Sequence, residues 1–227
     1  MRQANVAIDG FAGSGKTTVA VELAKRLQLV YLDTGLMYRA VALKCLREGI
    51  DPADSERLAA MMKDLDLVVQ VVHQPHPICR MQLEGEDVTD LLHDPQVSQG
   101  VPKVASISPV RRELVARQQA FARRGGVVMV GRDIASVVLP EAELKIFLVA
   151  DLGERARRRC LELQSKGKAV SLEEVERELG ERDHQDSTRA DSPLLCVEGA
   201  RRLDTTGKSI DEVVEQIGDW ISVARTG

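Results

Sequence analysis

The chain of 227 residues contains few aromatic side chains and no excess of positive charge. Phe, Trp and Tyr make up 3% of the sequence, and the formal net charge at pH 7 is −4. Proteins that bind nucleic acid generally need a basic surface and often stack bases on aromatic rings. We therefore expect no nucleic-acid partner. The 44% of hydrophobic residues nevertheless suffices for a buried core, which excludes a disordered tail.

Cysteines and long hydrophobic runs are also scarce. The four cysteines are far apart and form no C-x-x-C pair, which excludes a disulfide framework and a zinc ribbon. No apolar run approaches the ~18 residues that a membrane-spanning helix requires. The first residues lack the hydrophobic region of a secretory signal. We expect a cytoplasmic protein that does not associate with membranes.

Short apolar runs alternate with longer amphipathic segments along most of the chain. Strands are predicted at residues 5–8, 29–32, 127–130, 144–149 and 202–203. Helices are predicted at residues 16–27, 34–48, 109–124, 152–165, 172–188 and 210–223. This alternation is typical of an α/β domain with a parallel sheet.

Residues 65–101 interrupt the alternation with a β-rich pattern. Two strands are predicted there, at 67–72 and 78–83, followed by a turn at Gly85. We interpret this segment as a small antiparallel β insert. The remaining residues, 1–64 and 102–227, would form the core of a single domain.

The strongest motif is the glycine-rich sequence GFAGSGKT at residues 10–17, which matches G-x-x-x-x-G-K-[ST] between a predicted strand and a predicted helix. Its backbone N–H groups and the helix N-terminus would bind phosphate oxygens. Lys16 would reach the β- and γ-phosphates, and the Thr17 hydroxyl would bind Mg²⁺. The predicted ATP-binding residues are Gly10, Phe11, Ala12, Gly13, Ser14, Gly15, Lys16, Thr17 and Thr18.

Other features narrow the class of nucleotide-binding protein. No N-K-x-D motif of a GTPase is present, and Asp151 is only a weak candidate for a Walker-B aspartate. Arginines outnumber lysines, 22 to 9, which reflects either genomic composition or phosphate binding. Several arginines stand beside acidic residues after predicted strands, where ligands of open α/β sheets bind. This placement favours a small kinase.

The chain resembles the bacterial-type cytidylate kinases, which phosphorylate CMP and dCMP with ATP. The resemblance covers nearly the whole chain. Its motifs are I-D-G-x-A-G-S-G-K at 8–16, Y-L-D-T-G-x-M-Y-R at 31–39, V-x-V-G-R-D-I at 128–134, E-R-A-x-R-R at 154–159, E-R-D-x-x-D-x-x-R at 181–189 and D-T-T at 204–206.

This resemblance implies a P-loop kinase fold: a five-stranded parallel sheet flanked by helices, the β insert as the monophosphate-binding arm, and a mobile helical lid at residues 164–188. It also implies ATP and Mg²⁺ as cofactors, CMP and dCMP as substrates, and we expect a monomer. The implied catalytic residues are Lys16, Arg155, Arg159 and Arg182. The implied CMP-binding residues are Asp33, Thr34, Arg39, Arg111, Arg132, Asp133, Arg182, Asp186 and Arg189.

The chemistry of CMP agrees with these residue types. Arginines suit its phosphate, and Asp186 can accept hydrogen bonds from the ribose hydroxyls. Cytosine presents a donor at N4 and an acceptor at N3, so a pair formed by Arg132 and Asp133 would complement it and disfavour uracil. Taken alone, the motif at 181–189 is also typical of a solvated helix with charged residues four apart.

Several positions depart from the family pattern, two of them near the expected nucleotide sites. Phe11 stands where proline is usual, and Pro102 replaces a serine near the cytosine. The loss of that hydroxyl leaves UMP open as an alternative acceptor. A nucleotide-binding regulator that hydrolyses NTP slowly is a third hypothesis, although such a protein does not need an acceptor site rich in arginine.

Overall fold

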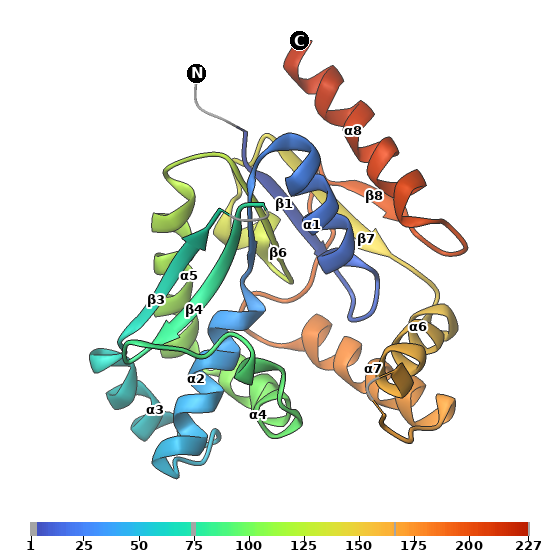
Figure 1. Ribbon diagram of the computed structural model, residues 1–227. Coiled ribbons are helices and arrows are strands. Elements are labelled where there is room, and N and C mark those ends of the chain that lie inside the picture. Colours follow the sequence, from blue (N-terminus) through green and yellow to red (C-terminus); the bar gives the residue numbers. More distant parts are fainter. Residues whose placement is uncertain (1–3, 74–75, 166, 227) are drawn as a thin grey trace.

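The computed structural model describes residues 4–73, 76–165 and 167–226. In this part of the chain eight strands form one sheet, and helices cover both of its faces (Figure 1). Seven of the strands follow the order β3-β4-β2-β6-β1-β7-β8, and the short strand β5 pairs with β4. The sheet is therefore continuous from the insert to the last strand.

Five of these strands form the parallel centre of the sheet. In spatial order they are β2 (Val30–Asp33), β6 (Val127–Gly131), β1 (Val6–Gly10), β7 (Leu144–Val149) and β8 (Arg201–Asp204). Each pairs in parallel with its neighbours. The predicted five-stranded parallel sheet is confirmed.

The insert contains the predicted antiparallel pair, β3 (Leu67–Val72) and β4 (Ile78–Leu83), with β5 (Glu86–Asp87) beside β4. Strand β4 also pairs in parallel with β2, where Tyr31 lies opposite Ile78. The insert thus extends the central sheet, a connection that the sequence pattern did not predict.

Two hydrophobic clusters lie on opposite faces of the sheet. One is formed with α1 (Lys16–Leu27) and α8 (Ile210–Thr226), which are adjacent in Figure 1. The other is formed with α2 (Gly35–Glu48), α4 (Pro95–Ser106) and α5 (Ser108–Ala122). Successive side chains of β1 and β6 enter alternate clusters, as the period of two in a strand requires, and both strands are buried on both faces.

Helices α6 (Leu152–Ser165) and α7 (Leu172–Thr188) match their predicted bounds. They pack together around a small apolar cluster of their own, to which Cys160 and Leu179 belong. Ser171 and Glu174 form a capping box at the start of α7, each accepting a hydrogen bond from the backbone N–H of the other. Helices α6 and α7 stand apart from the sheet in Figure 1, next to the phosphate loop.

Several short or irregular elements were not predicted. They are α3 (Ser55–Met61), α4, two 3₁₀ turns at Met62–Asp64 and Leu91–His93, and a π-helix at Ile134–Val138. Helix α4 contains Gly100 and Pro102, both poor helix formers, and it crosses the boundary that we expected at residue 101. Asp94 caps this helix, and Val97, Val101 and Val104 bury one face of it. Within the described residues, no helix is both long and apolar enough to span a membrane.

Candidate active site

The phosphate loop connects β1 to α1, and its glycines are required by its geometry. At Gly10 the φ angle is 149°, and a Cβ would lie 2.1 Å from the carbonyl oxygen of Leu148 on the neighbouring strand β7. Gly13, with φ at 74°, would place a Cβ 3.2 Å from that of Arg155. Glycine alone tolerates such close approaches together with positive φ angles.

Lys16 opens helix α1 with its side chain directed back over the loop. Its ammonium donates to the carbonyl oxygen of Phe11 at 2.5 Å and to Ser14 Oγ at 3.5 Å. Burial holds the pKa of Lys16 well below its ordinary value, and the positive charge of Arg132 lowers it further. Asp33 and Asp9 act in the opposite direction. Lys16 therefore belongs to the same electrostatic cluster as the residues predicted to bind the acceptor.

Arg155 supports the phosphate loop from helix α6. Its Nη1 donates to the carbonyl oxygen of Ala12 at 3.0 Å, and its Nε donates to that of Ala150 at 3.0 Å. The same Nη1 lies 2.6 Å from a carboxylate oxygen of Asp183, on α7. The guanidinium also lies over the Phe11 ring, 5.2 Å from its centroid. Arg155 thus connects the phosphate loop, the end of β7 and helix α7.

Arg158, which belongs to the motif at 154–159 but was not among the implied catalytic residues, also lies beside the phosphate loop. It donates to the hydroxyl and the carbonyl oxygen of Thr205 at 3.1 and 2.7 Å. Thr205 in turn donates to the carbonyl oxygen of Ser14 at 3.3 Å. Arg159, the residue predicted instead, pairs with Glu162 at 2.6 Å on a more exposed part of α6. The sequence signal for Arg158 was its position three residues after Arg155, on the same side of the helix.

A cluster of guanidinium groups surrounds Arg182 on α7. The pKa of Arg182 is lowered to about 10, mainly by burial. The positive charges of Arg132, Arg39 and Arg159 contribute to this lowering, whereas the negative charge of Asp186 acts against it. A side chain held so close to other cations is an arrangement suited to a multiply charged anion. This cluster and Lys16 are the part of the site able to bind phosphate groups.

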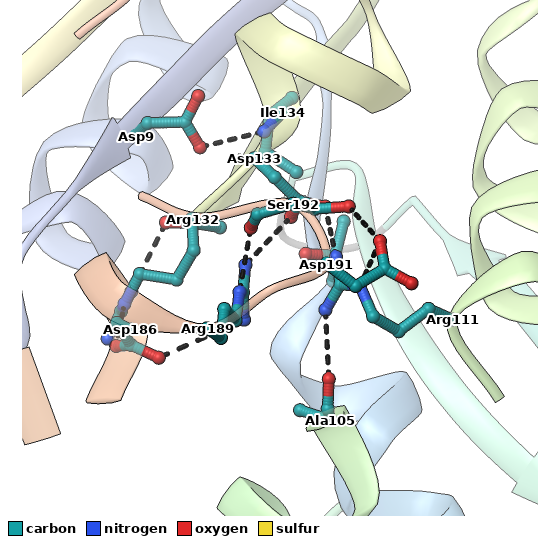
Figure 2. A network of polar contacts seen from close by, with 12 residues as sticks. Asp9, Ala105, Arg111, Arg132, Asp133, Ile134, Asp186, Arg189, Asp191 and Ser192 are labelled. Atoms are coloured by element: carbon teal, nitrogen blue, oxygen red, sulfur yellow. Dashed lines mark hydrogen bonds and ion pairs between the residues drawn. The ribbon is translucent and has the colours of Figure 1, made fainter. Parts of the chain in front are cut away.

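The acceptor residues divide into two paired groups (Figure 2). In the first, Arg132 Nε lies 2.6 Å from Asp186 Oδ2, and Arg189 lies 3.9 Å from the other oxygen of Asp186. Burial alone would raise the pKa of Asp186, but the charge of Arg132 and a hydrogen bond from it hold that pKa below its ordinary value. Asp186 therefore carries a negative charge between two arginines.

In the second group, Arg111 forms a buried ion pair with Asp133 and lies over the ring of Tyr38. Arg189 Nη2 is 3.9 Å from the other oxygen of Asp133, and Asp191 lies 3.7 Å from Arg111. We had expected Arg132 and Asp133 to act as a pair. In this structure the two side chains diverge after β6, and Arg132 pairs with Asp186 while Asp133 pairs with Arg111. Their joint recognition of the base stays a prediction.

Thr34 and Arg39 follow strand β2. The Thr34 hydroxyl donates to the carbonyl oxygen of Val130 at 2.9 Å, which joins the end of β2 to β6. Arg39 donates to Ser98 Oγ at 2.6 Å and to the carbonyl oxygen of Leu92 at 2.9 Å. Ser98, on the unpredicted helix α4, is thus another side chain that orients a predicted binding residue.

The oxygen groups at the start of α1 fit a magnesium ion. The Thr17 hydroxyl is exposed in the first turn of the helix, and the buried Tyr31 hydroxyl lies beside both Thr17 and Asp33. Hydroxyl and carboxylate oxygens are the ligands that Mg²⁺ prefers, usually with substrate phosphates completing its shell. Within the described ranges no three His, Cys, Asp or Glu side chains form a metal cluster, so any such ion would need phosphate oxygens as further ligands.

Comparison with known proteins agrees with this geometry. The family model described as cytidylate kinase matches residues 6–222. The chain belongs to the cytidylate kinase family. It is 47% identical over 212 residues to a cytidylate kinase of Desulfitobacterium hafniense, covering 93% of this chain and 90% of that protein. It is 48% identical to a cytidylate kinase of Caldanaerobacter subterraneus, covering 95% and 93% of the two chains.

A further relative is about twice as long as this chain, and a solved structure shares the fold alone. A bifunctional pantoate ligase/cytidylate kinase of Synechococcus is 46% identical over 94% of this chain and 43% of its own length. An uncharacterised protein from Eubacterium ventriosum shares the fold, with a TM-score of 0.54, 13% identity and coverage of 98% and 99% of the two chains. The latter supports the fold alone.

One buried residue of this cytidylate kinase fold was missed by sequence reasoning. Asp9, the residue before the phosphate loop, is 1% exposed and accepts two backbone hydrogen bonds from the segment that follows Asp133. Its signals in the sequence were its fixed place in the motif at 8–16 and its acidic character at the end of an otherwise apolar strand. It connects the donor and acceptor sides of the site.

Proposed function

We propose that this protein transfers the γ-phosphoryl group of ATP to CMP and dCMP. The observation that carries the proposal is that the phosphate loop and the acceptor cluster both contact α7. Arg155 binds Ala12 of the loop and pairs with Asp183 of this helix. Arg132 of the acceptor cluster pairs with Asp186 of the same helix. Membership of the cytidylate kinase family supports the same reaction. Donor and acceptor phosphates would meet between these cations.

Phosphoryl transfer in such a site needs alignment rather than a general base. The attacking group is a phosphate oxygen of CMP, which is already ionised at neutral pH. Lys16, Arg132 and Arg182 would neutralise the charge on the donor and acceptor phosphates and hold them in line. Arg158 and Arg159 extend this positive region along α6. The rate enhancement would then arise mainly from electrostatic stabilisation of the moving phosphoryl group.

The buried ion pair of Arg111 and Asp133 is the best candidate for recognition of the base. Asp133 can accept from the cytosine N4 amine, and Arg111 can donate to N3. Uracil presents O4 and N3–H at these positions, so both contacts would be lost. Burial raises the pKa of Asp133, while the neighbouring charge of Arg111 opposes this rise and favours the ionised form. Asp186 remains the candidate partner of the ribose hydroxyls.

Thr17 would hold a magnesium ion, with Asp33 and Tyr31 beside it. When bound, the ion would supply positive charge that stabilises the phosphate groups during transfer. Closure of α7 over the site would exclude water, which otherwise competes with CMP for the phosphoryl group. Arg155 and Asp183 link this helix to the phosphate loop and so would help to set its closed position.

The decisive experiment measures ADP release from ATP with CMP, dCMP, UMP and AMP as acceptors. Stimulation by CMP or dCMP is the expected result. A preference for UMP would support the alternative suggested by Pro102, whose side chain is exposed on α4. Release of ADP without dependence on an acceptor would contradict a kinase and favour a slow NTP-hydrolysing regulator.

We further propose that the enzyme acts as a monomer in the cytoplasm. The free thiols of Cys45, Cys79 and Cys160 are buried, and that of Cys196 is exposed, which suits a reducing compartment. Sedimentation at micromolar concentration measures the oligomeric state directly, and a dimer would contradict the first part of this proposal.

A further inference from the structure

The carboxylate of Asp9 lies at the end of β1, immediately before the phosphate loop, yet it binds a different segment. One oxygen accepts from the backbone N–H of Ile134 at 2.8 Å, and the other accepts from that of Ala135 at 2.7 Å (Figure 2 shows the first). Both oxygens are therefore occupied by fixed backbone donors. Asp9 opposes Gly131 in the parallel pairing of β1 with β6.

These two amides open the π-helix that follows Arg132 and Asp133. The carbonyl oxygen of Asp133 accepts from the N–H groups of Val137 and Val138 at 2.9 and 3.2 Å. The carboxylate of Asp9 thus fixes the first turn of the π-helix from one end, as an acidic side chain does at a helix N-terminus. The backbone of Arg132 and Asp133 is held between this turn and strand β6.

The environment shows that the charge of Asp9 is not placed there for stability. Burial raises the pKa of Asp9 to about 6, and the nearby charge of Asp133 adds to the rise. The two backbone hydrogen bonds and Lys16 act in the opposite direction. A carboxylate in this position carries an electrostatic cost that an apolar or neutral residue would avoid.

We propose that Asp9 is a positioning residue for the acceptor nucleotide: it orients Arg132 and Asp133 relative to the phosphate loop by binding the two amides that follow them. Arg132 and Asp133 approach Asp186 and Arg111 respectively, so one carboxylate sets the direction of both acceptor groups. This inference rests on the proposed function, since it assigns the residue to the binding of CMP.

The first experiment compares Asp9→Asn with the parent enzyme in steady-state kinetics. Asparagine has the same shape but can offer an acceptor to only one of the two amides, and its NH₂ group faces the other. We expect KM for CMP to rise about tenfold, with KM for ATP changed by less than about twofold. Asp54→Asn is the matched control, because Asp54 also accepts a backbone N–H, from Arg57, but lies at the exposed start of α3.

Equal increases in KM for ATP and for CMP would overturn the inference, because they would indicate general damage to the phosphate loop. An unchanged KM for CMP would overturn it as well. In either case CMP turnover by the parent enzyme leaves the proposed function intact, whereas failure of the parent enzyme to phosphorylate CMP would contradict the proposed function itself.

A double-mutant cycle tests whether Asp9 acts through Asp133. If it does, Asp9→Asn should change KM for CMP by less than about threefold when Asp133→Asn is already present. Full additivity of the two changes would contradict action through Asp133.

A measurement on the parent protein needs no substitution. The amide resonances of Ile134 and Ala135 should titrate with Asp9, and those of Arg132 and Asp133 should shift with the same midpoint in the absence of nucleotide. Titration confined to Ile134 and Ala135 would contradict a positioning role. This result is obtainable even if Asp9→Asn does not fold.

Discussion

Arg155 and Asp183 form a largely buried ion pair that joins α6 to α7, with 2.6 Å between Nη1 and a carboxylate oxygen. The other oxygen of Asp183 is buried without a hydrogen-bond partner among the described residues. Arg155 therefore supplies the positive charge that offsets the burial of this carboxylate. The same guanidinium donates to the carbonyl oxygen of Ala12. The packing of α7 and the shape of the phosphate loop therefore depend on one side chain.

We expect Arg155→Ala to lower the free energy of unfolding by about 3 kcal/mol, because it leaves Asp183 unpaired in a buried position. Urea denaturation measures the change. Arg157→Ala is the matched control: Arg157 lies on the same helix, its side chain is 59% exposed, and its pair with Glu154 should contribute little to stability. Adding Asp183→Asn to Arg155→Ala should recover part of the loss, and no recovery would contradict the argument.

Replacement of Lys16 tests the phosphate loop. Lys16→Met keeps the length of the side chain but removes its charge, so we expect kcat to fall by about a hundredfold or more. The melting temperature should stay near that of the parent, since the charged form of Lys16 is disfavoured by burial. Lys25→Met, on the exposed side of α1, provides the control. Turnover near normal in Lys16→Met would contradict the role assigned to this residue.

Asp133→Asn tests base recognition. An amide can present a donor where the carboxylate only accepts, so it can approach uracil O4 as well as cytosine N4. We expect the ratio of kcat/KM for UMP to that for CMP to rise by about tenfold or more, corresponding to roughly 1–3 kcal/mol for one base contact. Asp66→Asn, at an exposed position, should leave the ratio unchanged. An unchanged ratio in Asp133→Asn would remove Asp133 from base recognition.

Asp9 predicts a specific dependence of stability on pH. Its pKa in the folded protein is about 6 against an ordinary value of 3.8, so the folded state holds this proton more tightly than the unfolded state does. The bound proton stabilises the folded state below about pH 4, and this stabilisation is lost as the pH rises through 6. The free energy of unfolding falls by about 3 kcal/mol at most over this range. Urea denaturation between pH 4 and 7 should therefore show the parent losing stability relative to Asp9→Asn. A constant difference would show that the pKa of Asp9 is not raised.

The local pattern of the sequence was sufficient for most regular elements and for the phosphate loop. Strand β7 and helix α1 begin and end where their hydrophobic patterns do, because each is bounded by residues of different character. Helix α4 could not be predicted in this way. Its glycine and proline are poor helix formers, and its stability comes from packing against α2, which is distant in the sequence.

The ion pairs of the site could not be predicted either, because they too depend on contacts between residues distant in the sequence. Motifs identified Arg132 and Asp133 after a strand and Asp186 on a late helix, but ion pairing depends on where each side chain points in three dimensions. The sequence predicted that Arg132 and Asp133 act together on the base, but it did not indicate that Arg132 pairs with α7 and Asp133 with α5. The role of Asp9 was not predicted because its two partners are backbone N–H groups, which every residue except proline carries.

Helix α7 contacts the donor side through Asp183 and Arg155, and the acceptor side through Asp186 and Arg132. The two carboxylates are three residues apart on one rigid element. A ligand that displaces α7 by binding one side must change the contacts available on the other. Thermodynamic linkage then requires ATP to alter the affinity for CMP by the same factor by which CMP alters the affinity for ATP.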